Sequence, residues 1–227
     1  MSLTIAILSF NERNTLERVV ADLRAAAERA GCAFEVLIVD DGSTDGSAEV
    51  ANRLAASWPD VRLIAHPTNQ GLGGVYRTGF REARGSHLTF FPADGQFPPA
   101  ILEDFVPRMA DYDLVLGYLP STDQSAVEKV LSRAERFLYR LVLGPVPRFQ
   151  GIFMIRRELV EQMGLQSSGR GWAVVMELII KVAREQRHAV ISVPTRMVPR
   201  TNGRSKVRNL RTITSNFWQI IRLRSYL

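Results

Sequence analysis

The chain has 227 residues, of which 46% are hydrophobic and 23% charged, and it carries a formal net charge of +6. This ordinary globular composition excludes a low-complexity chain and suits one sizeable domain, or a domain with a small appendage. The lone Cys32 excludes an internal disulfide, and no apolar run approaches the ~20 residues of a membrane-spanning helix. Positive residues crowd the second half, which favours an anionic partner such as nucleic acid, acidic lipid or a phosphorylated substrate.

The first half alternates short apolar runs with amphipathic segments. Asn14 is expected to cap the first helix, with Glu17 three residues later in capping-box position. Each strand runs into a polar turn, and this alternation is typical of a parallel sheet covered by helices on both faces. The apolar runs predict strands at 4–8, 34–39, 61–65 and 87–91, and helical spacing predicts helices at 14–27, 48–56 and 75–83.

The second half departs from this rhythm but shows no linker that would divide the chain. Its patterns predict strands at 114–118, 151–155 and 189–193, and helices at 126–143, 157–163 and 172–185. We expect one mostly parallel α/β domain over residues 1–206, followed by a basic amphipathic helix over 207–227. The three histidines, His66, His87 and His188, are scattered without metal-ligand spacing, and a structural role suits each of them better than a catalytic one.

The most informative stretch begins with the apolar run 88–91, which leads into Asp94, Gly95 and Gln96. The double proline that follows, Pro98-Pro99, is expected to open the next helix. In an open α/β sheet, ligands bind just past the carboxyl ends of the strands, where Asp94 is expected to lie. An ordinary turn aspartate is the alternative.

Two adjacent acids, Asp40 and Asp41, end the second predicted strand. Neighbouring carboxylates repel each other unless a donor or a cation is present. One interpretation is a turn and helix cap built on Gly42 and Ser43. The other is recognition of a nucleobase N–H or a ribose hydroxyl, for which charged acceptors are suited.

A glycine-rich turn, Asn69-x-Gly71-x-Gly73-Gly74, follows the third predicted strand. It is a poor match to a dinucleotide fingerprint, because it does not follow the first strand and Tyr76 stands where the third glycine belongs. A nicotinamide-dependent enzyme is therefore not favoured. Arg77 on the following helix is either a ligand of a diphosphate or a solvated surface arginine.

Taken together, six motifs in register resemble the family 2 glycosyltransferases of GT-A fold, similar to dolichyl- or polyprenyl-phosphate sugar transferases. The resemblance covers nearly the whole chain. In chain order, the motifs are Ser9-Phe10-Asn11-Glu12, Val39-Asp40-Asp41-Gly42-Ser43-Thr44-Asp45, Asn69-x-Gly71-x-Gly73, Arg77-x-Gly79, Ala93-Asp94-Gly95-Gln96 and Arg200-x-x-Gly203-x-Ser205-Lys206.

The resemblance implies a role for each matching residue. Asp94 would be the catalytic ligand of Mg²⁺ or Mn²⁺, assisted by Gln96, and Arg200 and Lys206 would also be catalytic. Arg148, Arg200, Ser205 and Lys206 would bind the phosphate of the acceptor. The nucleotide sugar would be bound by Ser9, Phe10, Glu12, Asp40, Asp41, Arg77 and Ala93.

The chain departs from the family pattern at three positions. Pro92 replaces the first acid of the metal-binding Asp-x-Asp, which predicts a weakly held metal, and Leu8 replaces a proline. Pro147 stands where the family often has an aspartate, so that position provides no general base. Glu177 remains an alternative base.

The resemblance implies an inverting transfer of a sugar from a UDP- or GDP-linked donor to a polyprenyl phosphate of the dolichyl or undecaprenyl kind. We expect a peripheral enzyme on the cytoplasmic face of a membrane, with the basic amphipathic segments at 126–143 and 207–227 on the lipid surface. Packing of these helices on the sheet is the alternative for each. Alternatives are a glycan hydroxyl acceptor, or a non-catalytic basic module that binds membrane or nucleic acid. Nucleic acid is not expected, because Phe217 and Trp218 lie in an apolar stripe and do not alternate with arginines.

Overall fold

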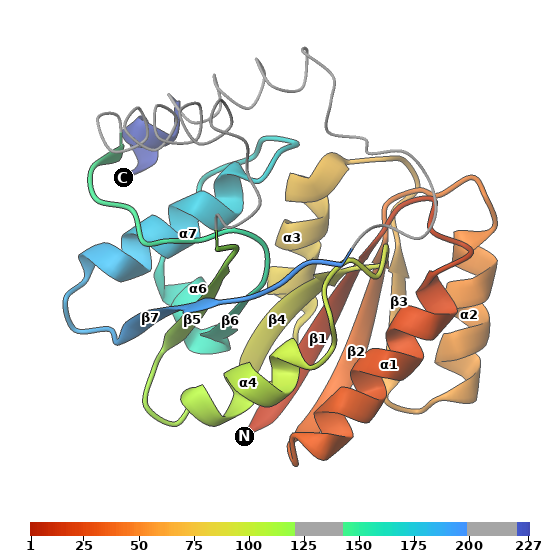
Figure 1. The fold of residues 1–227 in the computed structure, drawn as a ribbon. Helices are drawn as coiled ribbons and strands as arrows, with labels where there is room; N and C mark the ends of the chain where they lie inside the picture. The colour runs from red at the N-terminus through yellow and green to blue at the C-terminus, as the bar shows by residue number, and fades with distance from the viewer. Residues whose placement is uncertain (121–142, 199–221) are drawn as a thin grey trace.

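The computed structural model describes residues 1–120, 143–198 and 222–227 (Figure 1). The segments predicted to be amphipathic helices, at 126–143 and 207–227, lie almost entirely outside the described residues. The described elements are β1 (Ser2–Ser9), α1 (Leu16–Arg29), β2 (Ala33–Asp40), α2 (Ser47–Ser57), β3 (Val61–Ala65), α3 (Gly71–Glu82), β4 (His87–Pro92), α4 (Ile101–Arg108), β5 (Leu114–Tyr118), β6 (Phe153–Arg156), α6 (Arg157–Gln162), α7 (Ala173–Arg184), β7 (Val190–Pro194) and η1 (Arg224–Tyr226).

The strands form one seven-stranded sheet in the order β3-β2-β1-β4-β6-β5-β7. Strand β6 is antiparallel to both its neighbours, β4 and β5, and the other pairs are parallel. The expected mostly parallel α/β sheet is therefore confirmed. None of the described helices is both long enough and apolar enough to cross a membrane.

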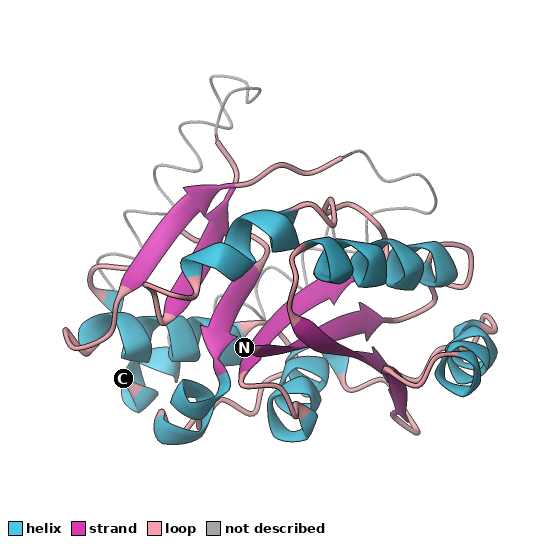
Figure 2. Ribbon diagram, turned by 90° about the horizontal axis from the view of Figure 1, so that it is seen from below, coloured by secondary structure: helices cyan, strands magenta, loops and turns pink. Residues whose placement is uncertain are grey.

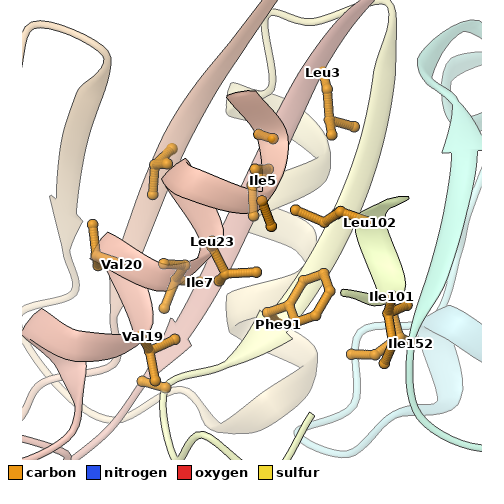
Figure 3. Close-up of a cluster of buried hydrophobic side chains, with 14 of the residues drawn as sticks. Leu3, Ile5, Ile7, Val19, Val20, Leu23, Phe91, Ile101, Leu102 and Ile152 are labelled. Carbon is orange, nitrogen blue, oxygen red and sulfur yellow. The ribbon is translucent and has the colours of Figure 1, made fainter. Parts of the chain in front are cut away.

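Helices cover both faces of the sheet, as the view from below shows (Figure 2). Helices α1, α2 and α4 pack on one face, and α3, α6 and α7 on the other. On the first face, Ile5 and Ile7 of β1 meet Leu23 of α1, and Phe91 of β4 meets Leu102 of α4 (Figure 3). These side chains are essentially inaccessible to solvent. Burying an aliphatic or phenyl side chain of this size contributes roughly 1.5–3 kcal/mol.

The opposite face is built around an aromatic cluster. The ring centroids of Tyr76 and Phe90 are 4.6 Å apart, and those of Phe90 and Phe153 are 5.5 Å apart. Gly79 makes room for this packing, because a Cβ atom there would lie 2.4 Å from the ring of Phe90. Helix α3 therefore lies close against β4, the strand that leads to Asp94.

Two predicted helix starts were wrong. Helix α1 begins at Leu16 with Thr15 as its N-cap, and neither Asn14 nor Thr15 makes a side-chain cap hydrogen bond there. The carbonyl of Glu12 instead accepts the amides of Thr15 and Leu16 in a tight turn. Helix α3 begins at Gly71 rather than at Val75, because a buried carboxylate holds its first amides, as described below.

The Pro98-Pro99 pair precedes α4 instead of opening it. The helix begins at Ile101, and the carbonyls of Pro98 and Pro99 accept the amides of Ile101 and Leu102. The two prolines thus provide acceptors for a turn that leads into the helix. They leave the segment after Asp94 outside any helix.

The strand register brings the predicted site residues to one edge of the sheet. Ser9 pairs with Asp40, Asp40 pairs with Ala65, and Leu8 pairs with Pro92. The backbone stays joined beyond the strands, because Asp41 N–H donates to Ser9 O and Ala93 N–H donates to Leu8 O. The loops that follow β1, β2, β3 and β4 therefore gather at the carboxyl edge, at the top of Figure 1.

Candidate functional site

Asp40 ends β2 at this edge with a side chain that is 1% exposed. Its carboxylate accepts hydrogen bonds from the amide and hydroxyl of Ser43, at 3.0 and 2.6 Å, and from the Ser9 hydroxyl at 3.3 Å. These donors replace the water that burial removes. Asp40 therefore fixes the turn after β2, and its contact with a nucleoside stays a prediction.

Asp41 connects β2 to the start of α3. Its carboxylate accepts the amides of Gln70 at 2.8 Å and Gly71 at 2.9 Å, and lies 2.8 Å from Nδ1 of His66. The other ring nitrogen of His66 is 2.9 Å from the hydroxyl of Thr78. Because the carboxylate can only accept, a neutral His66 donates from Nδ1 and accepts the Thr78 proton at Nε2. All these side chains are buried, so Asp41 holds α3 against the sheet, and its predicted nucleoside contact is untested.

The first motif, Ser9-Phe10-Asn11-Glu12, is hydrogen bonded to the segment that follows β2. Asn11 has a φ of 54°, a left-handed conformation that asparagine adopts more readily than most residues. Its amide donates to Ser43 Oγ at 2.9 Å, and the amide of Glu12 donates to Ser47 Oγ at 2.9 Å. Phe10 and Glu12 are half-buried beside these contacts. The structure thus brings the first two motifs together, as expected of one binding site.

The glycine-rich turn packs against protein. The amide of Gly73 donates to the carbonyl of Arg170 at 2.8 Å, and a Cβ atom on Gly73 would lie 2.2 Å from the Gly169 carbonyl. Asp41 already occupies the amides of Gln70 and Gly71. A phosphate bound at a helix N-terminus needs such amides to be free, and most of those at the start of α3 are used.

Arg77 reaches the same neighbouring loop. Its Nη1 donates to the carbonyl of Gly169 at 2.9 Å and more weakly to that of Ser167 at 3.4 Å. Burial lowers the pKa of the guanidinium, although an arginine stays charged at any physiological pH. The structure places Arg77 in a structural contact, and its predicted contact with the diphosphate is untested.

Asp94 lies in the turn after β4, next to the buried Ala93. Its Oδ1 accepts the amide of Gln96 at 3.1 Å, and in the part of the chain described here no donor reaches Oδ2. The left-handed Gly95 makes the turn possible at a φ of 72°. Asp94 is partly exposed and is thus presented toward solvent, in contrast to Asp40 and Asp41.

The Asp94 turn fits a metal ion only in combination with a substrate. The described ranges contain no group of three or more His, Cys, Asp or Glu side chains that could hold a metal. Asp94 has a carboxylate oxygen to offer, and Gln96 follows two residues later. Mg²⁺ commonly binds through one or two carboxylates together with the phosphates of a substrate. Pro92 stands at the position of the first family acid, so this turn offers the carboxylate of Asp94 without a second acid two residues before it.

On the acceptor side, the structure describes Arg148 alone among the predicted phosphate-binding residues. Its guanidinium lies over the ring of Tyr118, 5.7 Å from the centroid. Arg148 is exposed, and the neighbouring Gln150 amide donates to Gly117 O at 2.7 Å. Arg200, Ser205 and Lys206 lie outside the described residues, so their predicted roles stay predictions.

Glu177 is not placed as a general base. Its side chain is fully buried in α7, and its two oxygens accept the amides of Gln166 and Ser167 at 2.9 and 2.8 Å. Lys181 donates to the same carboxylate at 2.7 Å. A substrate hydroxyl cannot approach a carboxylate in this position, so this alternative is wrong in the described structure.

Sequence reasoning missed two features of the site. The first is the His66 bridge between Asp41 and Thr78, for which a lone histidine after a strand gave no specific signal. The second is the loop between α6 and α7, which docks on α3. A sequence signal for this loop was present, because Glu177 is the only carboxylate of α7 and precedes Lys181 by four residues in a mostly apolar helix.

Comparison with known proteins identifies related chains. Residues 4–164 match the family model described as glycosyl transferase family 2. A dolichol-phosphate mannosyltransferase of Pyrococcus furiosus is 28% identical over 233 residues, covering 98% of this chain and 64% of that protein. A dolichol-phosphate mannosyltransferase of Saccharomyces cerevisiae is 30% identical over 182 residues, covering 76% of this chain and 68% of that protein. The chain thus spans just under two thirds of the Pyrococcus relative.

Solved structures share the fold at lower identity. Glucosyl-3-phosphoglycerate synthase from Mycobacterium tuberculosis, in complex with Mn²⁺, UDP and phosphoglyceric acid, has a TM-score of 0.69 at 19% identity, covering 96% of this chain and 78% of that one. A mannosyltransferase from Pyrobaculum calidifontis, in complex with GDP-Man and Mn²⁺, has a TM-score of 0.60 at 16% identity, covering 98% and 72%. These likenesses support the expected GT-A fold.

Proposed function

Since the chain belongs to glycosyl transferase family 2, we propose that it transfers a sugar, with inversion, from a nucleoside-diphosphate sugar to a polyprenyl phosphate. One observation carries this proposal. The first two motifs are joined by hydrogen bonds at the carboxyl edge of the sheet, where the turn after β4 presents the carboxylate of Asp94. Relatives named as dolichol-phosphate mannosyltransferases support the choice of acceptor.

The donor is proposed to lie along the carboxyl edge of β1, β2 and β4. Ser9, Phe10, Glu12, Asp40 and Asp41 would surround the nucleoside, with Ala93 beside it. This assignment is supported by the hydrogen bonds that join the loops after β1 and β2. The UDP and GDP-Man bound to structures of the same fold favour a UDP- or GDP-linked donor.

Asp94 and Gln96 are proposed to hold a divalent cation together with the donor diphosphate. Mg²⁺ or Mn²⁺ would neutralise charge on the leaving group. The partly exposed Asp94 suits this role, since an acidic side chain at a strand end can face the diphosphate. With a single carboxylate, we expect the metal to bind much more tightly in the presence of nucleotide than alone.

A phosphate acceptor suits a site in which neither Pro147 nor Glu177 provides a general base. Pro147 occupies the position where the family often has an acid, and Glu177 is buried and fully hydrogen bonded. A phosphate monoester is already anionic, so it needs positioning and charge neutralisation rather than proton removal. An acceptor oxygen bonds to the anomeric carbon, the bond from this carbon to the diphosphate breaks, and the electron pair leaves with the nucleoside diphosphate.

Arg148, Arg200, Ser205 and Lys206 are proposed to hold the acceptor phosphate. The exposed guanidinium of Arg148 supports this role. We also propose peripheral binding at the cytoplasmic face of a membrane, on the basis of the basic amphipathic patterns at 126–143 and 207–227. Flotation with acidic liposomes at low salt tests this placement: we expect the protein to float, and recovery in the soluble fraction alone contradicts it.

The donor half of the proposal is tested by measuring nucleotide release from a panel of GDP- and UDP-sugars, with Mn²⁺ and polyprenyl phosphate. We expect release from one donor class, dependent on both metal and acceptor. In parallel, titration calorimetry with GDP and UDP, with and without Mn²⁺, separates an enzyme from a non-catalytic basic module. Binding of neither nucleotide in either condition contradicts the proposal.

A further inference from the structure

The α6–α7 loop (residues 163–172) is held to α7 by a charged pair whose carboxylate is buried. Glu177 is fully buried and accepts the amides of Gln166 and Ser167 at 2.9 and 2.8 Å. Lys181 donates to Glu177 at 2.7 Å and to the carbonyls of Met163 and Gly164 at 3.1 and 3.2 Å. One ion pair thus binds both amides and carbonyls of the same loop.

Burial alone would raise the pKa of Glu177, but the hydrogen bonds from Lys181 and the loop amides outweigh it and leave the pKa lowered. The carboxylate is therefore charged at neutral pH. A buried charge is tolerated only where donors of this kind surround it. The loop amides are among those donors, so the loop conformation and the ionised carboxylate depend on each other.

The other side of the α6–α7 loop docks on α3, in the region where the two lie close together in Figure 1. Arg77 donates to the Gly169 carbonyl at 2.9 Å, and the amide of Gly73 donates to the Arg170 carbonyl at 2.8 Å. A Cβ atom on Gly71 would lie 2.7 Å from the Arg170 carbonyl. The glycines of the motif thus permit this contact, which brings Arg170 to the N-terminal end of α3.

Arg170 lies next to the carboxyl edge of the sheet. Its Nη2 donates to Asn69 Oδ1 at 2.6 Å, while Asn69 Nδ2 donates to the Asp41 carbonyl at 3.2 Å. A single amide side chain therefore connects Arg170 to the strand end proposed to bind the nucleoside. Arg170 is exposed, and none of the ion pairs among the described residues includes its guanidinium.

We propose that Arg170 binds the nucleotide of the donor, and that Glu177 is the positioning residue that holds Arg170 in place through the α6–α7 loop. A guanidinium pairs with two oxygens of a diphosphate, or with O6 and N7 of a guanine. The diphosphate oxygens and the guanine atoms are all hydrogen-bond acceptors that a guanosine diphosphate offers. The proposal rests on the proposed function, because it assumes that a nucleotide binds at the carboxyl edge.

The test is a double-mutant cycle on nucleotide affinity in the full chain, measured by calorimetry with GDP and UDP in the presence of Mn²⁺. We expect Arg170→Met to weaken binding by about tenfold, the effect of one charge-assisted hydrogen bond. Glu177→Gln keeps the size of the side chain, but a carboxamide cannot accept both amides and Lys181, so we expect a comparable loss. If Glu177 acts through Arg170, the double variant binds no more weakly than Arg170→Met.

Two matched controls accompany the cycle. Arg84→Met removes an exposed arginine at the opposite edge of the sheet, and Glu161→Gln removes an exposed carboxylate of α6. Both are expected to leave nucleotide affinity unchanged.

A loss of affinity in Arg170→Met for both nucleotides identifies the diphosphate as its partner, and a loss for GDP alone identifies the guanine. Unchanged affinity in Arg170→Met, or additive losses in the cycle, overturns the proposal. Arg170 is exposed, so its variant remains informative even where Glu177→Gln does not fold.

Hydrogen exchange of the ligand-free protein separates this proposal from the proposed function. In Glu177→Gln, we expect the amides of Gln166 and Ser167 to exchange at least tenfold faster, because they lose their acceptor. Unchanged exchange overturns the positioning role of Glu177, whatever nucleotides bind. If the unaltered protein binds neither GDP nor UDP while exchange does accelerate, the proposed function and the role of Arg170 fail, and the role of Glu177 in holding the loop stands.

Discussion

At the scale of single residues, the three strand-end aspartates differ in what surrounds them. Asp40 and Asp41 are buried and accept several hydrogen bonds each from protein donors. From the described residues, Asp94 accepts one, from the amide of Gln96, and it is partly exposed. The two buried acids shape the edge of the sheet, and Asp94 is the one that we propose meets a metal-bound diphosphate.

We therefore predict that Asp94→Asn keeps the fold and weakens Mn²⁺-dependent nucleotide binding by tenfold or more, which is about 1.4 kcal/mol. Calorimetry with and without Mn²⁺ measures this effect. Asp111→Asn is the matched control, since Asp111 is exposed in the turn after α4. Equal affinities for the unaltered protein and Asp94→Asn, with and without Mn²⁺, would contradict the proposed role of Asp94.

Thr78→Val tests the buried bridge behind Asp41. The variant keeps the shape of the side chain but removes the hydroxyl that lies 2.9 Å from His66 Nε2. Because His66 is buried, its unpaired nitrogen should cost about 1–3 kcal/mol in the free energy of unfolding. Urea denaturation measures this cost, with the exposed Thr68→Val as the control. Equal stability of the two variants argues against the bridge.

At the level of elements, the α6–α7 loop and α3 form one unit on the face of the sheet that α3, α6 and α7 cover. The motif Asn69-x-Gly71-x-Gly73 resembles a ligand-binding turn in the sequence, yet its glycines contact protein in the structure. Sequence spacing cannot distinguish these uses, because glycine permits the close approach of a ligand or of another backbone equally well.

Gly73→Ala is expected to disrupt this unit. The added Cβ would lie 2.2 Å from the Gly169 carbonyl and 2.5 Å from the Gly171 carbonyl, distances that require the backbone to move. We expect a loss of about 1–3 kcal/mol in the free energy of unfolding, the usual cost of overpacking. Leu72→Ala, at an exposed neighbouring position, should change stability far less. Wild-type stability in Gly73→Ala would mean that the loop does not pack on α3 in this way.

The sequence predicted most elements because hydrophobic period and turn residues act locally. Strands 61–65 and 114–118 were placed with their observed ends. Helix starts were less predictable. The start of α3 is set by Asp41, whose carboxylate accepts the amide of Gly71, thirty residues later in the chain. In the site, the clustering of the first two motifs followed from parallel strands, whereas the contacts of Arg77 depend on a loop distant in sequence.

For the whole molecule, burial and pairing of ionisable groups predict how stability depends on pH. Burial lowers the pKa of His87, and hydrogen bonds lower the pKa of Glu177 and Glu35 despite their burial. A lowered native pKa means that the unfolded chain binds more protons, so acid favours unfolding. Stability should therefore decline below about pH 6.5 through His87, and further below about pH 4.3 through the two glutamates.

Urea denaturation at pH 8, 7, 5.5 and 4 measures this profile. We expect a constant free energy of unfolding between pH 8 and 7 and a progressive fall below. His87→Leu should remove the decline between pH 7 and 5.5 and leave the fall at lower pH. A free energy of unfolding that stays level or rises toward pH 4 contradicts the assignment.

Transfer to a polyprenyl phosphate is tested by offering the full chain a labelled nucleotide sugar and either a polyprenyl phosphate or the unphosphorylated polyprenol. We predict label in an organic-extractable product that is cleaved by mild acid, formed from the phosphate alone and lost in Arg200→Ala. Label transferred equally to the polyprenol, or found only on water-soluble glycans at a rate that Arg200→Ala leaves unchanged, would contradict the claim.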